Sequence, residues 1–334
     1  MTIDTRRRRT LSALAAGAAC ASPLARAAEA FFPGPESGPR SAPSRPLVAR
    51  ARREGLLGTN AAFDTKLLDA ALGAAVARAA GERTPVEAFR RLFKPTDVVG
   101  IKVNCLGGRG VSSRPEVALH LAAWLQASGV SPDRILVWDR TDRELREAGY
   151  AIQSGRGVRV EGTNGDWDEQ VTEWGPAGSR FARALVQDLT AVISLGTLKD
   201  HGLAGASLSM KNWYGVVHNP NKLHDGNCAP YVPHLVAHPL VRGKLRLSVL
   251  EGSTAQCHGG PGRAPRWSWP YQGFLASTDP VALDAIGWQT IEARRREVGL
   301  GPLATEDREP RYIALAAKLG LGVADPARIE VADV

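Results

Sequence analysis

Histidines are concentrated in one part of this chain. Six of the seven lie between His201 and His258, in a window that also holds two of the four cysteines. Imidazole titrates near neutral pH and is the commonest metal ligand, so the cluster indicates where proton transfer or metal binding would occur. Lys199, Asp200 and His201 open the window. A lysine, a carboxylate and an imidazole in one loop suit an anion or metal site, although a solvated polar loop is the alternative.

The segment SLSMKNWYGVV, residues 207–217, holds further candidates. Lys211 and Asn212 are polar residues in an otherwise small and apolar helix, where a buried lysine and amide need partners. The alternative is a surface lysine beside a capping amide. Two serines place hydroxyls near the helix start, where backbone N–H groups favour an anion. Gly215 permits close approach of another group to the backbone.

Metal binding is one hypothesis for the histidines. We expect His201, His218, His224 and His258 as ligands of a divalent metal, and the alternative is that they only decorate long loops. The chain contains no C-x-x-C pair. An iron–sulfur cluster is therefore not expected.

A glycine-rich segment, CHGGPG at residues 257–262, follows a predicted strand. Gly259 and Gly260 permit a loop that either cradles an anion or simply turns the chain, and the segment lacks the lysine of a nucleotide P-loop. Cys257, which is next to a histidine, belongs either to a metal-ligand or thiolate pair or to a disulfide with Cys228. We favour the disulfide.

Two aspartates lie in STDPVALDAIGW, residues 277–288. Asp279 precedes a proline and is typical of a helix start. Asp284 has mostly apolar neighbours, so its carboxylate is expected to be buried and paired with a lysine such as Lys102 or Lys211.

The elements that would position these residues alternate between strands and helices. Strands are expected at 97–104, 134–139, 190–196, 244–252 and 274–278, and helices at 64–80, 84–93, 113–129, 207–217 and 280–295. Thr84 and Ser113 are expected helix N-caps, each followed three residues later by a glutamate. Residues 97–139 predict a right-handed βαβ unit. The sequence therefore predicts an α/β fold: a mostly parallel or mixed sheet, helices on both faces in Rossmann-like layers, and functional loops at strand C-ends.

The first 30 residues have the pattern of an export signal. Arg6 to Arg9 form a basic region, and residues 10–21 are weakly apolar and too short to anchor the chain. The arginine pair and the low hydrophobicity favour the twin-arginine route, whose export machinery is then a partner. We expect a periplasmic or other extracytoplasmic protein without a stable membrane anchor. Residues 31–46 read as a Pro- and Gly-rich linker, and residues 47–334 as a single α/β domain.

Net charge limits the classes of partner. The formal charge is +8, and part of the excess lies in the five arginines of residues 1–30. The remaining basic residues are spread out and form no stripe interleaved with aromatic residues, so nucleic acid is not an expected partner. The positive net charge predicts only a mild preference for small anionic ligands.

Several segments resemble, in order, those of the domain of unknown function 362 family. VVGIKVNC resembles the family's opening strand, SLGTLKDHG its Asn-x-Pro-Lys-x-Lys-x-His loop and SMKNWYGVV its Ser-x-Lys-Asn-x-x-Gly helix. LEGSTAQCHGGPG is similar to its Asp-Gly-x-x-x-x-x-Gly-Gly-Pro segment, with Glu251 in place of the usual Asp, and STDPVALDAIG to its Ser-x-Asp-Pro-Val-Ala-x-Asp ending. The resemblance covers roughly residues 95–287. It implies these site positions: Lys102, Lys199, His201, Lys211, Asn212, Asp279 and Asp284.

Two hypotheses for function follow. The first is an exported enzyme that acts on a carboxylate or phosphate, with His201 as acid or base and Lys199, Lys211 and Asp284 as the other catalytic residues, with or without a metal. The ligand would be held by Lys102, Asn104, Asn212, Gly259, Gly260 and Asp279. The second is a non-catalytic periplasmic protein that binds or handles a metal or cofactor through the histidines.

Overall fold

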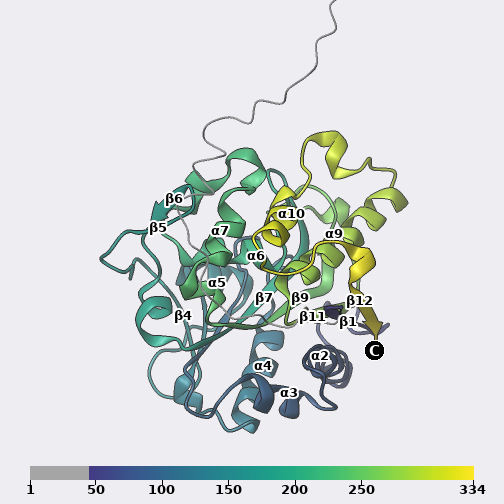
Figure 1. Ribbon diagram of the computed structural model, residues 1–334. Coiled ribbons are helices and arrows are strands. Elements are labelled where there is room, and N and C mark those ends of the chain that lie inside the picture. Colours follow the sequence, from purple (N-terminus) through teal and green to yellow (C-terminus); the bar gives the residue numbers. More distant parts are fainter. Residues whose placement is uncertain (1–44) are drawn as a thin grey trace, which may run out of the picture. The chain divides into compact units, whose positions relative to one another are not determined.

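The computed structural model describes residues 45–334, so the expected signal segment and nearly all of the linker lie outside the described residues. Ten strands of this part form one sheet, in the order β12-β1-β11-β9-β7-β2-β3-β4, with β8 and β10 paired to β7 and β9 (Figure 1). The strands are β1 (Leu47–Arg52), β2 (Val99–Lys102), β3 (Ile135–Asp139), β4 (Arg159–Gly162), β7 (Ala191–His201), β8 (Gly205–Ala206), β9 (Leu245–Gln256), β10 (Ser268–Trp269), β11 (Gly273–Ser277) and β12 (Glu330–Asp333). A separate hairpin pairs β5 (Thr172–Trp174) with β6 (Ala177–Ser179).

The direction of the strands divides the sheet into two parts. β4, β3, β2, β7 and β9 run parallel to one another, whereas β11 is antiparallel to both β9 and β1. From β2 the chain moves outward to β3 and β4 and then returns to β7 on the other side of β2. The strand order therefore reverses between β2 and β7, and ligands of open α/β sheets bind at such a switch point.

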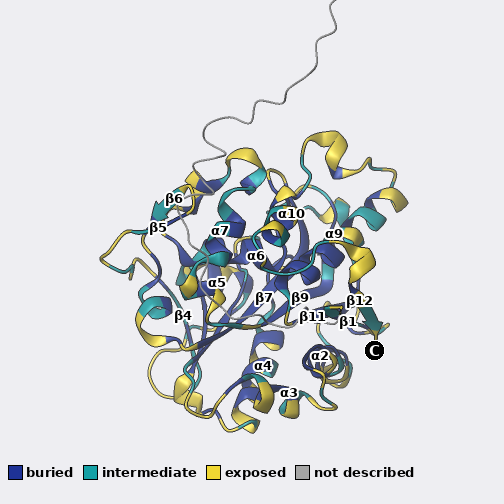
Figure 2. Cartoon of the chain, viewed as in Figure 1, coloured by how far each residue is buried: buried dark blue, intermediate teal, exposed yellow. Residues whose placement is uncertain are grey.

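Helices cover both faces of the sheet, as predicted. α2 (Thr65–Ala80), α3 (Pro85–Leu92), α4 (Pro115–Ala127) and α5 (Asp142–Ala148) pack on one face, and α6 (Leu208–Lys211), α7 (Tyr231–Ala237), α8 (Pro239–Arg242), α9 (Pro280–Glu297) and α10 (Arg311–Lys318) on the other. Each face has its own cluster of buried apolar side chains, and the central strands between them are buried throughout (Figure 2). The α/β fold with a mixed sheet is thus confirmed.

Most predicted elements form close to their expected positions because their signals are local. The predicted βαβ unit is β2–α4–β3, and both strands pair in parallel. Thr84 forms the expected capping box with Glu87. The expected cap at Ser113 is wrong: Arg114 is the N-cap residue, and the hydroxyl of Ser113 donates 2.7 Å to the carbonyl of Leu195.

The prediction for the cysteines is also wrong. Cys105, Cys228 and Cys257 are free and buried, so the expected disulfide between the last two is not formed. Burial raises the pKa of all three thiols, which keeps them protonated and poorly nucleophilic at neutral pH.

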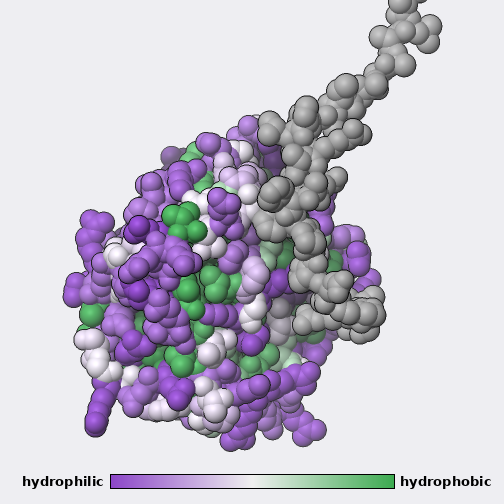
Figure 3. Space-filling model, turned by 60° about the vertical axis from the view of Figure 1, so that its left-hand side comes forward, coloured by the Kyte–Doolittle hydropathy of each residue, from purple (hydrophilic) through white to green (hydrophobic). Residues whose placement is uncertain are grey.

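The surface view shows mostly polar side chains. On the face in Figure 3, hydrophobic side chains form small patches between hydrophilic ones, and scattered patches of this kind are ordinary on a folded protein. Within residues 45–334, no helix has both the length and the hydropathy needed to span a bilayer.

Candidate functional site

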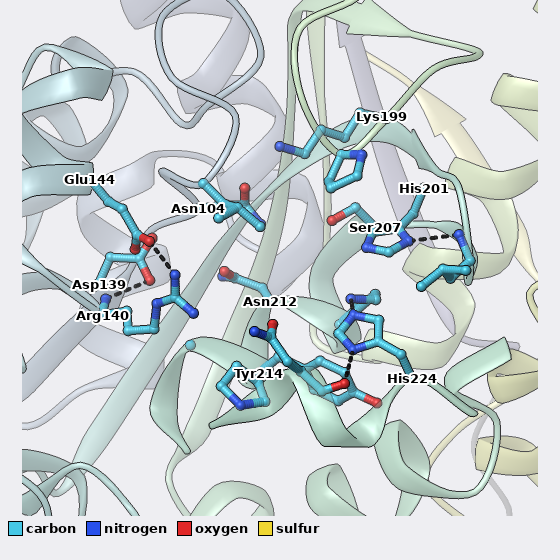
Figure 4. Close-up of a pocket in the computed structure, with 18 of the residues that line it drawn as sticks. Asn104, Asp139, Arg140, Glu144, Lys199, His201, Ser207, Asn212, Tyr214 and His224 are labelled. Carbon is cyan, nitrogen blue, oxygen red and sulfur yellow. Dashed lines mark hydrogen bonds and ion pairs between the residues drawn. The ribbon is translucent and has the colours of Figure 1, made fainter. Parts of the chain in front are cut away.

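A pocket of about 820 Å³ lies at the switch point, where β2, β3 and β7 end. Its lining includes three lysines, Lys102, Lys199 and Lys211, together with His201 and His224. Figure 4 shows Lys199, His201 and His224 on one side and Asp139, Arg140 and Glu144 on the other, with Asn104 and Asn212 between them. The sequence therefore predicted the pocket's three lysines and its two histidines.

Lys102 is fully occupied by protein groups. Its Nζ donates to Asp139 Oδ1 at 2.7 Å, to the carbonyl of Val103 at 2.7 Å and to Asn212 Oδ1 at 3.2 Å. An ammonium has three N–H donors, so none is left for a ligand. Gly215 lies directly against this ion pair, since a Cβ there would stand 2.6 Å from Lys102 Nζ. The close backbone approach predicted at Gly215 is therefore found.

Asn212 and Asp139 complete this network. The amide of Asn212 donates to the carbonyl of Lys102 at 2.9 Å and to Ser194 Oγ at 3.2 Å. The second oxygen of Asp139 accepts 2.7 Å from the backbone N–H of Cys105. Lys102 and Asn212, which we expected to bind the ligand, thus join β2, β3 and α6 into a frame around the pocket.

Lys199 and Lys211 are buried without a carboxylate partner among residues 45–334. Lys199 Nζ donates only to the carbonyl of Val111, at 2.9 Å, and Lys211 Nζ contacts only His224 Nε2, at 3.2 Å, and the face of Tyr214, 4.4 Å from the ring centre. Lys199 is 1% exposed and Lys211 is 7% exposed. Each ammonium therefore keeps two N–H donors for a ligand.

Burial lowers the pKa of both lysines. The pKa of Lys199 falls to about 8 and that of Lys211 to about 8, in both cases chiefly because the charged form loses its hydration. Each is still mostly protonated at pH 7 but gives up its proton far more readily than a surface lysine. An anion in the pocket would favour the charged forms.

His201 is held as a neutral imidazole. Its Nδ1 accepts from the backbone N–H groups of Leu203, at 3.1 Å, and Ala204, at 3.2 Å. The proton of the neutral ring must then lie on Nε2, on the edge turned away from these amides and toward the pocket (Figure 4). Burial, with Lys211 nearby, lowers the pKa of His201 to about 2. His201 can thus donate a hydrogen bond from Nε2 into the pocket, and the acid or base role expected for it stays a prediction.

His224 orients Lys211. Its Nδ1 lies 3.1 Å from the carbonyl of Asn221, which can only accept, so Nδ1 carries the proton and Nε2 accepts from the ammonium of Lys211. The ring also stacks on His201, with 5.5 Å between the ring centres. Burial and the neighbouring ammonium lower the pKa of His224. The two histidines and Lys211 therefore form one contiguous polar wall.

The two aspartates expected in the site lie outside the pocket. Asp284 accepts from Ser209 N and Oγ, at 2.9 and 2.7 Å, and from Met210 N at 3.0 Å, so its partner is the start of α6 and not a lysine. The N–H groups that we expected to hold an anion are therefore taken by this carboxylate. Asp279 caps α9, as its Asp-Pro context predicts, and also accepts from Val323 N at 3.1 Å.

The glycine segment is used for packing. Gly260 lines the pocket, but its N–H donates 2.9 Å to Asp200 Oδ1, and a Cβ at Gly260 would stand 2.1 Å from the carbonyl of Asp200. Gly259 does not line the pocket. The structure therefore assigns the turn, and not the anion cradle, to these two glycines.

Lys199, Asp200 and His201 lie in β7 and not in a loop, because the strand continues to pair with β8 and β9 beyond its expected end.

The four histidines expected as metal ligands do not come together. His201 and His224 stack in the pocket, whereas His218 packs its ring against Trp167 and His258 Nδ1 faces two arginine side chains. Within residues 45–334, no group of three or more histidine, cysteine, aspartate or glutamate side chains is arranged to hold a metal ion.

Sequence reasoning missed several residues of the lining. Asp139 and Glu144, with Arg140 beside them, form one wall, and Tyr214 contributes to another. Asp139 is the polar end of a buried strand, a signal that could have been read. Glu144 pairs with Arg140, four residues earlier and just before α5, and nothing in its local sequence distinguishes it from a surface residue. Asn104, which was expected, has a buried side-chain oxygen without a hydrogen-bond partner among the described residues.

Comparison with known families identifies one matching family. A family model described as a domain of unknown function (DUF362) matches residues 99–289, which is more than half of the chain. The chain belongs to the DUF362 family. Every residue that lines the pocket lies within the matched DUF362 segment. No curated protein matches the chain.

Proposed function

We propose that this pocket binds a small anionic molecule, a carboxylate or a phosphate, and that the protein is an enzyme that acts on it. One observation carries the proposal: Lys199 and Lys211 are buried in one pocket, have no carboxylate partner among the described residues and keep unused N–H donors. Buried ammonium groups without a counterion are costly to the fold. A bound anion would compensate that cost.

The charge of the lining supports an anion. Four cations line the pocket, but Lys102 is matched by Asp139 and Arg140 by Glu144. The two remaining lysines leave an excess of two positive charges when both are protonated. Such an excess in a partly desolvated pocket attracts carboxylates and phosphates more strongly than neutral sugars or peptides.

The same residues support a chemical role. A group transfers protons best when its pKa lies near the working pH, and a pKa of about 8 brings Lys211 into that range. His201 would donate from Nε2 to the oxygen that gains negative charge. Lys199 would hold the anionic group. We therefore propose Lys211 as the proton-transfer residue and His201 as the stabilising donor.

Binding measurements test the anion site. Calorimetric titration at pH 7 with inorganic phosphate and with a series of mono- and dicarboxylates is expected to show binding that is lost in Lys199→Met and in Lys211→Met. Lys66→Met, which removes an exposed lysine of α2, is the matched control and should bind like the wild type. Equal affinity in all four proteins would refute the site. Affinity should also fall as the pH rises above about 8, where the two lysines lose their protons.

A second variant tests the role of His201. His201→Asn keeps an oxygen that can accept from Leu203 and Ala204 but removes the ring donor. We expect an intact fold and about tenfold or greater loss of affinity, since a hydrogen bond to a charged group contributes about 1.5–3 kcal/mol. Unchanged affinity would show that the ring does not contact the ligand.

The alternative function, metal or cofactor handling, has a direct test. His201 and His224 are the only two of the four expected ligands that line the pocket. The metal content of the purified protein, with His201→Asn as comparison, decides between the hypotheses. One equivalent of metal that disappears in the variant would favour the alternative.

We further propose that the chain is exported by the twin-arginine route to the periplasm or its equivalent. The basic run from Arg6 to Arg9 and the weakly apolar stretch after it support this. Cell fractionation of the wild type and of an Arg7→Lys, Arg8→Lys variant tests it. We expect the variant to stay in the cytoplasm, and equal export of both proteins would contradict the route.

A further inference from the structure

The pocket changes character from its floor to its mouth. Lys199 and Lys211 are 1% and 7% exposed, whereas Leu106 and Leu203, which line the same pocket, are both 56% exposed. Burial thus places the charges deep and the apolar side chains at the entrance. This is the reverse of the usual arrangement, in which apolar groups lie inside and charged groups face water.

The two leucines are unusual within the described chain. Large apolar side chains with such exposure occur at four positions of residues 45–334: Leu106, Leu119, Val171 and Leu203. Two of the four lie at this one pocket. An apolar side chain held in water loses the stabilisation that burial would give it, so the pairing of two such residues at one entrance calls for a ligand that covers them.

Hydrogen bonds of the site hold the backbone at Leu203 and next to Leu106. The backbone N–H of Leu203 donates to His201 Nδ1 at 3.1 Å. Leu106 follows Cys105, whose backbone N–H donates to Asp139 Oδ2 at 2.7 Å. The segments that carry the leucines are therefore tied to residues of the pocket wall.

We propose that the ligand is an amphipathic organic acid, with its anionic head at Lys199 and Lys211 and an apolar chain against Leu106 and Leu203. Such a molecule would match both unbalanced features at once: the deep cations without a counterion and the leucines exposed at the mouth. Inorganic phosphate or a small dicarboxylate would match only the first. This inference rests on the proposed anion site and specifies the substrate class of that site.

A homologous series of ligands tests the inference. Unbranched carboxylates from butyrate to decanoate, and alkyl phosphates of the same lengths, are titrated into the wild type at pH 7. Full burial of a methylene strengthens binding about fourfold, so we expect about two- to threefold per methylene for a chain that lies at the pocket mouth. The two series separate a carboxylate head from a phosphate head.

Two variants assign the effect to the leucines. A Leu106→Ser, Leu203→Ser protein should bind butyrate like the wild type and should lose most of the gain with chain length. Leu119→Ser, which changes a leucine that is 48% exposed and lies outside the pocket lining, is the matched control and should keep the gain. Circular dichroism confirms that the three proteins fold alike.

The outcomes separate this inference from the function on which it rests. Binding that does not strengthen with chain length, or that strengthens equally in the double variant, overturns the amphipathic ligand and leaves the anion site standing. If no carboxylate or phosphate of any length binds, and Lys199→Met does not differ from the wild type, both proposals fail.

Discussion

Replacing Lys199 with methionine tests whether the pocket holds a buried charge at a cost to the fold. Burial lowers the pKa of Lys199 from 10.5 to about 8. Because one pKa unit corresponds to about 1.4 kcal/mol, the protonated lysine costs the native state about 3 kcal/mol at pH 7. Methionine has a similar shape and no charge. The variant also loses the hydrogen bond from Lys199 to the carbonyl of Val111. This loss reduces the gain in stability by about 1 kcal/mol.

The variant is therefore expected to be more stable than the wild type by about 2 kcal/mol at pH 7. The sign of the pH dependence follows from the lowered pKa. Between about pH 8 and 10.5 the unfolded chain keeps a proton on Lys199 that the native protein has lost, so wild-type stability rises with pH in this window. The advantage of Lys199→Met should shrink across this window, vanish near pH 10 and reverse slightly at higher pH, where only the lost hydrogen bond to Val111 remains.

Urea unfolding at pH 7, 8.5 and 10 measures these differences, with Lys66→Met as the exposed control that should match the wild type throughout. A variant that is less stable than the wild type at pH 7, or a difference that does not change with pH, would refute the assignment of an unpaired buried ammonium. A stabilised variant that no longer binds anions would show a residue kept for binding at the expense of stability.

Three further results are expected. Gly215→Ala places a Cβ 2.6 Å from Lys102 Nζ and should destabilise the protein by about 1–3 kcal/mol in urea, whereas Gly262→Ala, which meets open space, should be neutral. Burial raises the pKa of Asp284 from 3.8 to about 7, so its contribution to stability is complete below about pH 4 and is lost as the pH rises through 7; Asp284→Asn should unfold with a shallower pH dependence over that range, and an unchanged slope would contradict the raised pKa. The three buried cysteines should react with a thiol reagent only after the protein is unfolded, and all three should then react without prior reduction. If only one of the three reacts in the unfolded protein, the other two form a disulfide.

The arrangement of strands and helices could be predicted because its signals are local. Apolar runs marked the central strands, and Thr84 and Asp279 marked helix starts that the structure contains. The strands β1 and β12 were missed, since each becomes a strand by pairing with a segment far away in the sequence. Ser113 failed as a cap for the same reason, because its hydroxyl is bound to Leu195, 82 positions away.

The candidate site was predicted in part. The sequence by itself indicated that Lys102 and Lys199 lie near the C-terminal ends of two predicted strands. Such ends meet at one edge of an α/β sheet, so Lys199, His201 and Lys211 could be expected together. Only the tertiary structure decided what each one does. The partners of Lys102 lie 37 and 110 positions away, and they occupy its ammonium while those of Lys199 and Lys211 stay available. Each N–H donor binds a single acceptor, and that acceptor often lies in a distant segment of the chain. The local sequence therefore does not show which donors remain free for a ligand.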